Sequence, residues 1–112
     1  MESFVIHKQG EDHYYAALLS NNGRIILRGK DCTNLTECKF SIDSIRSNAT
    51  DYAKYELMTA NDGKYYFKVK GSHGDEIARS EIFEDTSLRY EGIVLVRRTI
   101  PYAIIDDQLY AS

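Results

Sequence analysis

The residues best suited to bind a ligand are one aromatic and three basic side chains in the second half of the chain. Tyr66, Lys68 and Lys70 alternate along one strand-like segment, and Arg79 follows in the next. Alternate residues of a strand share one face, and an aromatic ring among cations is typical of single-stranded nucleic-acid binding. The net charge of −3 and the pI near 5.6 argue against this use, because nucleic-acid-binding domains carry a basic footprint. A nucleic-acid-associated protein is therefore the alternative function.

The other reactive residues form no recognisable catalytic or metal-binding pattern. The three histidines, His7, His13 and His73, are scattered, and no Cys/His spacing matches a zinc site. Acidic pairs such as Glu84-Asp85 fall at the ends of expected elements, where capping explains them. There is no glycine-rich phosphate loop and no nucleophile elbow. We expect a protein that is not an enzyme and that binds no cofactor and no metal.

The cysteines and the N-terminus indicate the compartment. Cys32 and Cys38 are too few for a disulfide framework, and we interpret them as reduced thiols of a cytosolic protein. No apolar run approaches the roughly 20 residues that span a bilayer. The first residues lack the basic and then apolar pattern of a secretory signal. We therefore predict a cytoplasmic protein with no membrane segment.

An internal duplication predicts the architecture. Residues 4–49 repeat as residues 55–100, at a constant shift of 51 positions and without a gap. The identical positions, named in the first copy, are Tyr14, Tyr15, Gly23, Ile26, Arg28, Ile42 and Arg46. Each copy is small for a core of its own. We expect residues 1–112 to form a single domain in which the two repeats share one core.

Each repeat predicts three short strands followed by a helix. We expect strands at residues 4–8, 13–20 and 24–29 and at residues 55–59, 64–71 and 75–81, with a last strand at 102–106. Asn22-Gly23 is typical of a type I′ hairpin turn, and Gly74 keeps the glycine in the second repeat. Asn34 and Asp85 are equivalent helix N-caps.

These elements predict an α+β fold made of two tandem βββα repeats plus a C-terminal strand. Local hairpins are antiparallel, and strands and helices are segregated along the chain. We therefore expect one antiparallel sheet with two helices packed on one face.

The same residues resemble the YegP-like family, small bacterial tandem-repeat proteins of unknown function. The resemblance rests on Asn22-Gly23 with the apolar residues after it, on Ser80-Glu81-Ile82-Phe83, and on Gly92-Ile93 with Val96 three residues later. The chain departs from the family pattern in the first repeat, where Gly29-Lys30 replaces Ser-Glu. The resemblance implies a two-repeat sheet-and-helix fold, in a family whose single-repeat members are able to assemble as dimers. It implies no known activity and no catalytic residue.

One half of the predicted sheet carries no charge on the side away from the helices. The residues expected on this half are Val5, Tyr15, Ala17, Leu19, Ile25 and Leu27. A contiguous exposed apolar patch usually marks an interface; the alternative is that residues 102–110 or a loop cover it. We therefore predict a protein-interaction or self-association module. Its partner is a second copy in a homodimer or an unidentified protein, and not nucleic acid, a membrane or a metal.

Overall fold

Each half of the chain folds into three strands and a helix in the computed structural model, which describes the backbone of residues 2–111 and the side chains of residues 2–106. The first half forms β1 (Ser3–Gly10), β2 (His13–Leu19), β3 (Ile25–Cys32) and α1 (Leu35–Asn48). The second half forms β4 (Tyr55–Thr59), β5 (Tyr65–Lys70), β6 (Glu76–Arg79) and α2 (Thr86–Thr99). A short 3₁₀ helix, Tyr52–Lys54, precedes β4, and β7 (Ile104–Ala111) follows α2. The α+β class and the repeated βββα order are confirmed.

The hairpin turns place their glycines in the left-handed region. Gly23 has φ of 83° and Gly74 has φ of 81°. Asn22 is not among the residues with positive φ, so the predicted type I′ turn is wrong. Ser20 instead closes the loop by donating to Arg24 O at 2.9 Å and by accepting from Gly23 N at 3.0 Å. This is a three-residue loop in which only the glycine needs the left-handed conformation.

Both helices begin at the predicted caps. The Asn34 side chain accepts a hydrogen bond from Glu37 N at 2.9 Å, and the Asp85 carboxylate accepts one from Leu88 N at 2.8 Å. The Glu37 carboxylate also accepts from Thr33 N at 2.7 Å. These side chains satisfy backbone N–H groups that a helix start leaves without partners.

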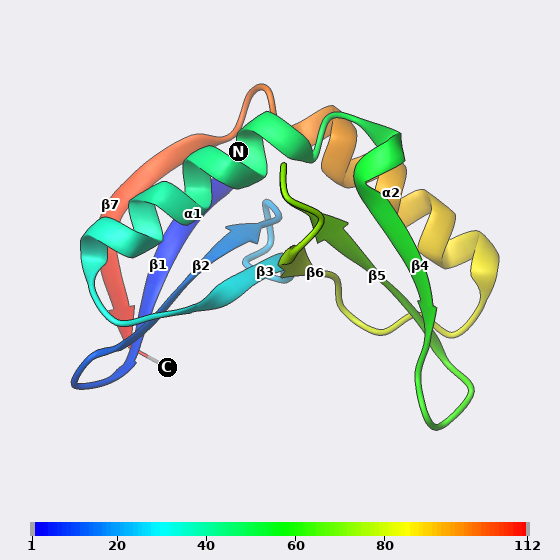
Figure 1. The fold of residues 1–112 in the computed structure, drawn as a ribbon, viewed down its shortest axis with the longest axis horizontal. Helices are drawn as coiled ribbons and strands as arrows, with labels where there is room; N and C mark the ends of the chain where they lie inside the picture. Colours follow the sequence, from blue (N-terminus) through cyan, green and yellow to red (C-terminus); the bar gives the residue numbers. More distant parts are fainter. Residues whose placement is uncertain (1, 112) are drawn as a thin grey trace.

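A seven-stranded sheet joins strands from both repeats in the order β4-β5-β6-β3-β2-β1-β7. At its centre β3 and β6 are antiparallel, with Arg28 opposite Arg79 and Gly29 opposite Ala78. Arg28 and Arg79 are equivalent positions of the two repeats. A pseudo-twofold axis therefore passes between them and relates the two halves of the sheet (Figure 1).

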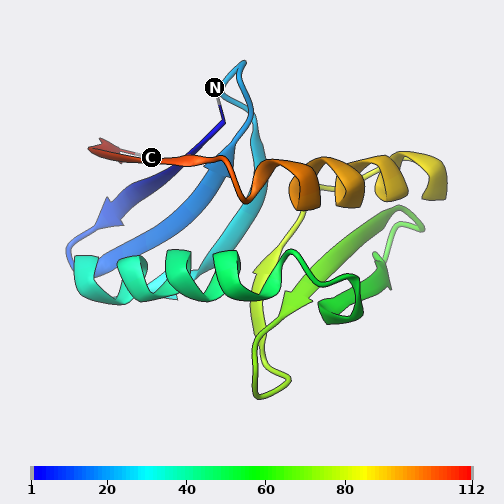
Figure 2. The same ribbon diagram turned by 90° about the horizontal axis from the view of Figure 1, so that it is seen from above.

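The sheet is mixed, so the prediction of a purely antiparallel sheet is wrong in one strand. β7 pairs with β1 in parallel, with Ser3 opposite Ile104 and Ile6 opposite Leu109. Figure 2 shows β7 leaving the end of α2 and running back beside β1. β7 follows α2 in the chain as β4 follows α1. The pseudo-twofold axis relates β4 to β1, so the equivalent connection after α2 brings β7 alongside β1. Because β1 already occupies the position next to β2, β7 takes the next position outward.

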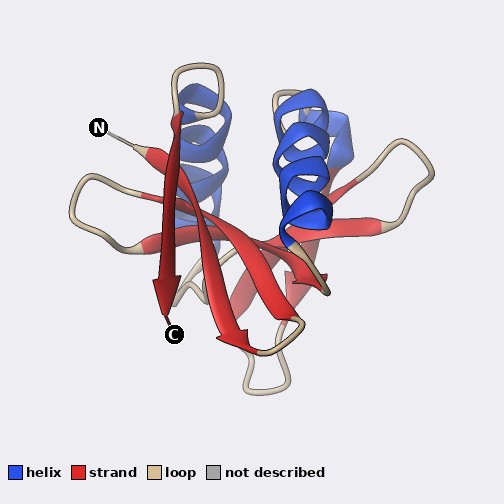
Figure 3. Ribbon diagram, turned by 90° about the vertical axis from the view of Figure 1, so that its left-hand side faces the viewer, coloured by secondary structure: helices blue, strands red, loops and turns tan. Residues whose placement is uncertain are grey.

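Both helices cover the same side of the sheet (Figure 3). The main core lies between them and the sheet, and its largest fully buried side chains are Phe4, Phe67, Leu18, Leu27, Ile42, Ile45, Ile93 and Ile100. Residues of both repeats contribute to this core. No helix of the described chain is long and apolar enough to cross a membrane.

Two equivalent arginines hold the chain where it leaves the helices. Arg46, in α1, donates to Ile100 O at 3.1 Å and also to Ala103 O, in the segment between α2 and β7. Arg97, in α2, donates to Thr50 O at 3.3 Å, in the segment between α1 and β4. Each arginine therefore holds the segment that leaves the other helix, and the recurrence of this residue in the sequence has a structural cause.

Candidate functional site: the open face and the outer edge of the sheet

The side of the sheet away from the helices, called the open face below, does not expose the apolar patch that the sequence predicts. Val5, Tyr15 and Ala17 form a second buried cluster on this face. Leu19 and Ile25 are partly buried against that cluster. The prediction that these residues form the exposed face is therefore wrong, because they pack on one another.

Polar side chains pack on this apolar cluster. The His7 ring stacks on the Tyr15 ring, with centroids 4.8 Å apart, and the Arg28 guanidinium lies 3.8 Å from the Tyr15 centroid. Tyr15 is 5% exposed between them. Burial, and then the positive charge of Arg28, lowers the pKa of His7 below 6.5. The lowered pKa favours the neutral imidazole, so that Arg28 supplies the positive charge against the Tyr15 ring.

Leu27 lies on the helix side of the sheet and belongs to the main core. In the β2–β3 pairing Leu18 lies opposite Leu27, whereas Leu19 lies opposite Ile25. Ile26 is therefore an extra residue in β3, as in a β-bulge. The bulge shifts the alternation by one residue, which places both Ile26 and Leu27 in the main core. Strict alternation from Ile26 had predicted Leu27 on the open face.

The C-terminal segment does not fold across the open face. β7 lies beside β1 within the sheet, and Tyr102 is 80% exposed. The part of this segment from residue 107 onward has side chains outside the described set.

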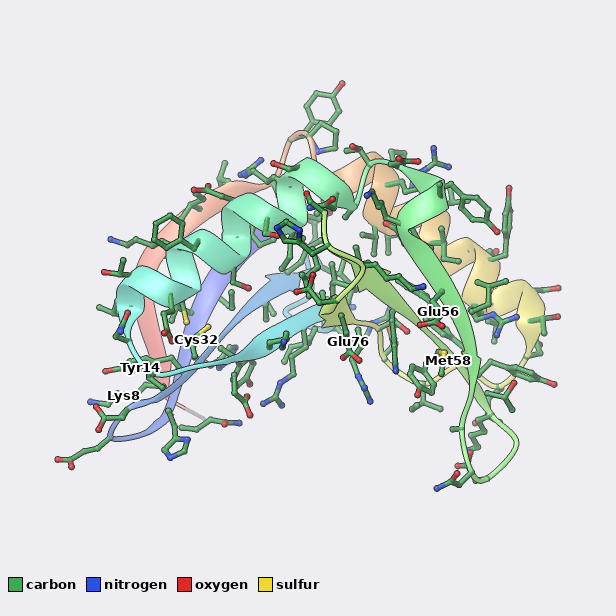
Figure 4. All side chains as sticks on the ribbon, in the orientation of Figure 1. Lys8, Tyr14, Cys32, Glu56, Met58 and Glu76 are labelled. Carbon is green, nitrogen blue, oxygen red and sulfur yellow. The ribbon has the colours of Figure 1, made fainter. Side chains whose placement is uncertain are left out.

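The residues of the predicted nucleic-acid face lie together on the open face of the second repeat. Lys68 lies opposite Arg79 across β5 and β6. Glu76 also projects from β6 (Figure 4). Its carboxylate accepts two hydrogen bonds from Arg79, both 2.9 Å, and forms an ion pair with Lys68 at 3.3 Å. The Arg79 guanidinium, with Lys68 as a further cause, lowers the pKa of Glu76 below its usual value of 4.5.

The remaining members of this predicted face are also engaged within the protein. Lys70 pairs with Glu56 of β4 at 3.9 Å, and the Arg79 guanidinium lies 5.3 Å from the Tyr66 centroid. A base that stacked on the face of Tyr66 covered by Arg79 would have to displace Arg79, and a phosphate would compete with Glu56 and Glu76 for the cations. On the second repeat, the open face is thus a network of ion pairs in which these cations are neutralised.

A groove of about 500 Å³ follows the seam between the repeats on this face. Its lining residues are Arg28, Gly29, Lys30, Asp31, Glu76 and Arg79. Arg28 pairs with Asp31 at 3.1 Å as Arg79 pairs with Glu76, so each central arginine has its own carboxylate. Exposed pairs of this kind contribute little to stability. No three His, Cys, Asp or Glu side chains lie close enough together to hold a metal ion within the part of the chain that the structure describes.

The outer edge of β4 is a candidate surface that the amino-acid sequence does not predict. β4 is the first strand of the sheet, and β5 is its single neighbour in the strand order. Leu57, at the middle of β4, is 49% exposed. The 3₁₀ helix that precedes the strand adds Tyr52, which is also exposed. The sequence predicts the strand at 55–59, but it does not predict that this strand is an edge.

Comparison with known proteins gives matches along the whole chain. The model of a family described as a domain of unknown function (DUF1508) matches residues 60–107. A UPF0339 protein of Bordetella pertussis is 33% identical over 111 residues, which cover 99% of this chain and 100% of that protein. The UPF0339 protein YegP of Escherichia coli K12 is 31% identical over 94 residues, which cover 84% of this chain and 86% of YegP.

Two solved structures share the fold. The solution NMR structure of YegP from Escherichia coli, a protein of unknown function, has a TM-score of 0.87 at 28% identity and covers 96% of this chain and 93% of that one. The solution NMR structure of a UPF0339 protein from Shewanella oneidensis has a TM-score of 0.86 at 25% identity and covers 96% and 92%.

Proposed function

This chain belongs to the UPF0339 family, which includes YegP, and we propose that it is a non-catalytic protein-binding module of the cytoplasm. The observation that carries the proposal is the unequal burial of equivalent strands. Ile6 of β1 is 8% exposed, whereas Leu57, its counterpart in β4, is 49% exposed. A duplicated domain that covers an apolar strand in one half and exposes it in the other has a surface suited to a protein partner.

Ion pairing on the open face favours this function over the nucleic-acid alternative. Nucleic-acid affinity depends on cations that are free to neutralise phosphates. Lys68, Lys70 and Arg79 each pair with a carboxylate of the protein itself. The proposed partner is therefore a protein, and neither nucleic acid, a membrane nor a metal is part of the proposal.

The test is capture by the immobilised full chain from extract of the source cell, with and without nuclease and at low and high salt. We expect a protein that is retained after nuclease treatment and at high salt, because an apolar contact is not screened. Loss of all retained material after nuclease, or a steep fall with salt, would instead support the nucleic-acid alternative. The Lys68→Gln variant is the matched control. It removes one cation of the open face, so it should reduce the retained material only if the protein binds nucleic-acid phosphates.

A further inference from the structure

The pseudo-twofold axis relates β1 to β4, but the two strands have different outer neighbours. β7 pairs with the outer side of β1 in parallel. In the sheet as described, no strand pairs with the equivalent outer side of β4. The protein therefore contains one filled and one unfilled example of the same strand-binding geometry, and the filled example shows what fits.

Burial of equivalent side chains follows this difference. Phe4 and Ile6 of β1 are buried in the main core, where β7 lies beside them. Their counterparts at the shift of 51 are Tyr55 and Leu57, and both are more exposed than their partners in β1. The strand that has a neighbour on its outer side is thus the more buried of the two equivalent strands.

The backbone of β4 presents hydrogen-bonding groups to this vacant side. Tyr65 exchanges hydrogen bonds with Phe83, at 3.0 and 2.6 Å, on the side of β5 away from β4. Tyr66, opposite Met58, therefore bonds toward β4, and strand alternation directs the N–H and C=O of Leu57 and Thr59 outward. On β1 the equivalent alternation directs Glu2 outward, and Glu2 O indeed accepts from Ile104 N, the first residue of β7, at 3.3 Å.

We propose that the outer edge of β4 is a strand-addition site that binds an extended segment of a partner protein parallel to β4. The proposal rests on the protein-binding function and specifies its surface and its mode. The expected register follows from β1 and β7, in which Phe4 lies opposite Ile105 and, beyond an irregularity in the pairing, Ile6 lies opposite Leu109. The bound segment has aliphatic residues opposite Tyr55 and Leu57 and backbone N–H groups free to pair, which excludes proline there.

Charges on β4 restrict the partner further. Glu56 is the one charged residue within β4, and its ion pair with Lys70 is long, at 3.9 Å. A carboxylate on the bound segment beside Glu56 would be repelled, so the segment carries a neutral or basic residue there. Arg89 of α2 donates to Met58 O at 3.0 Å, and this bond does not involve the outward groups of Leu57 and Thr59.

The test uses full-length protein labelled for NMR and a synthetic peptide of residues 102–111 as the probe. This peptide makes the proposed pairing within the chain, and Asp106→Asn and Asp107→Asn in the peptide remove the repulsion from Glu56. We expect amide shift changes centred on residues 55–59 at peptide concentrations up to about 1 mM, the weak end of specific affinities. A scrambled peptide is the control.

Two proline variants test the backbone pairing. Leu57→Pro and Thr59→Pro remove outward N–H groups and no bond to β5, so both are tolerated at an edge. We expect each to abolish the shift changes, whereas Leu57→Thr, which keeps the N–H, retains part of the binding. Melting curves of the variants establish that they fold. If Leu57→Pro does not fold, Thr59→Pro provides the test.

Three results would overturn the proposal. The first is the absence of shift changes at 55–59 in the folded parent. The second is shift changes confined to residues 3–8, which would mean that the peptide displaces β7 from β1. The third is a dimer that Leu57→Pro dissociates while the peptide fails to bind, which would assign the edge to self-association. If Leu57→Pro still captures the nuclease-resistant partner, the strand-addition site fails while the protein-binding function stands.

Discussion

Gly92 is the position where a single methyl group has the most informative effect. A Cβ added there would lie 2.5 Å from Phe83 Cζ and 3.0 and 3.3 Å from the two Cε atoms of the same ring. The first distance is shorter than any tolerated contact. Movement of the ring would disturb its stacking on Phe67, whose ring centroid lies 6.1 Å away. Gly92 is therefore needed so that α2 can approach the Phe83 ring.

Two opposing contributions determine the stability of Gly92→Ala. Replacing glycine by alanine within an exposed helix stabilises it by about 1 kcal/mol. Overpacking a well-packed site costs about 1–3 kcal/mol. The difference is a net destabilisation of up to about 2 kcal/mol, opposite in sign to the effect of helix propensity alone. The measurement is urea unfolding followed by far-UV circular dichroism, from which the free energy of unfolding is extrapolated.

Phe83→Leu makes this prediction specific. Leucine has no atoms equivalent to Cε1, Cε2 and Cζ, so all three close contacts are removed. In the Phe83→Leu background Gly92→Ala should therefore become stabilising, and the double-mutant cycle should show a coupling of about 1–3 kcal/mol. Ser47→Ala, on the exposed side of α1, is the control and should behave alike in both backgrounds. The reasoning is refuted if Gly92→Ala stabilises the parent or if its effect is the same in both backgrounds.

Two further predictions concern ionisable groups. The pKa of Glu76 is lowered mainly by Arg79, so the stabilising contribution of its carboxylate is complete above the usual value of 4.5 and is lost as the pH falls through the lowered pKa. In acid titrations the parent should therefore lose stability below pH 4.5 more steeply than Glu76→Gln. Parallel curves would contradict this prediction. Burial, with the neighbouring Cys32 as a further cause, raises the pKa of Cys38 to about 12, so iodoacetamide should modify Cys38 only after urea unfolding, as mass spectrometry would show. Rapid labelling of the folded protein would disprove the burial of this thiol.

Local features of the fold are predictable from the sequence because local chemistry determines them. The side chains of Asn34 and Asp85 cap the helices, since each bonds a nearby backbone N–H. Gly23 and Gly74 mark the turns because the backbone there needs a positive φ. The shift of 51 residues predicts the repeated order of elements before any tertiary contact is known.

The errors arise where long-range contacts decide. Leu27 faces the main core because β3 contains an extra residue relative to β2, and alternation within one strand does not reveal a bulge between two. Tyr15 is buried because His7 and Arg28, from two other strands, stack on its ring. The parallel direction of β7 depends on β1 already occupying the position beside β2. Each of these outcomes depends on a neighbour that is distant in the sequence.

The same dependence explains why the two halves differ despite their common plan. Arg46 and Arg97 hold equivalent segments, and these segments lead to β7 and to β4 at opposite edges of the sheet. The segment after α2 leads to β7, which adds to a first half that already has three strands, so β1 becomes an interior strand. The segment after α1 leads to β4, which is itself one of the three strands of the second half, so β4 lies at an edge. A twofold repeat in a single chain thus produces two different sheet edges, and the proposed binding surface is the β4 edge, which has no equivalent of β7 beside it in the described sheet.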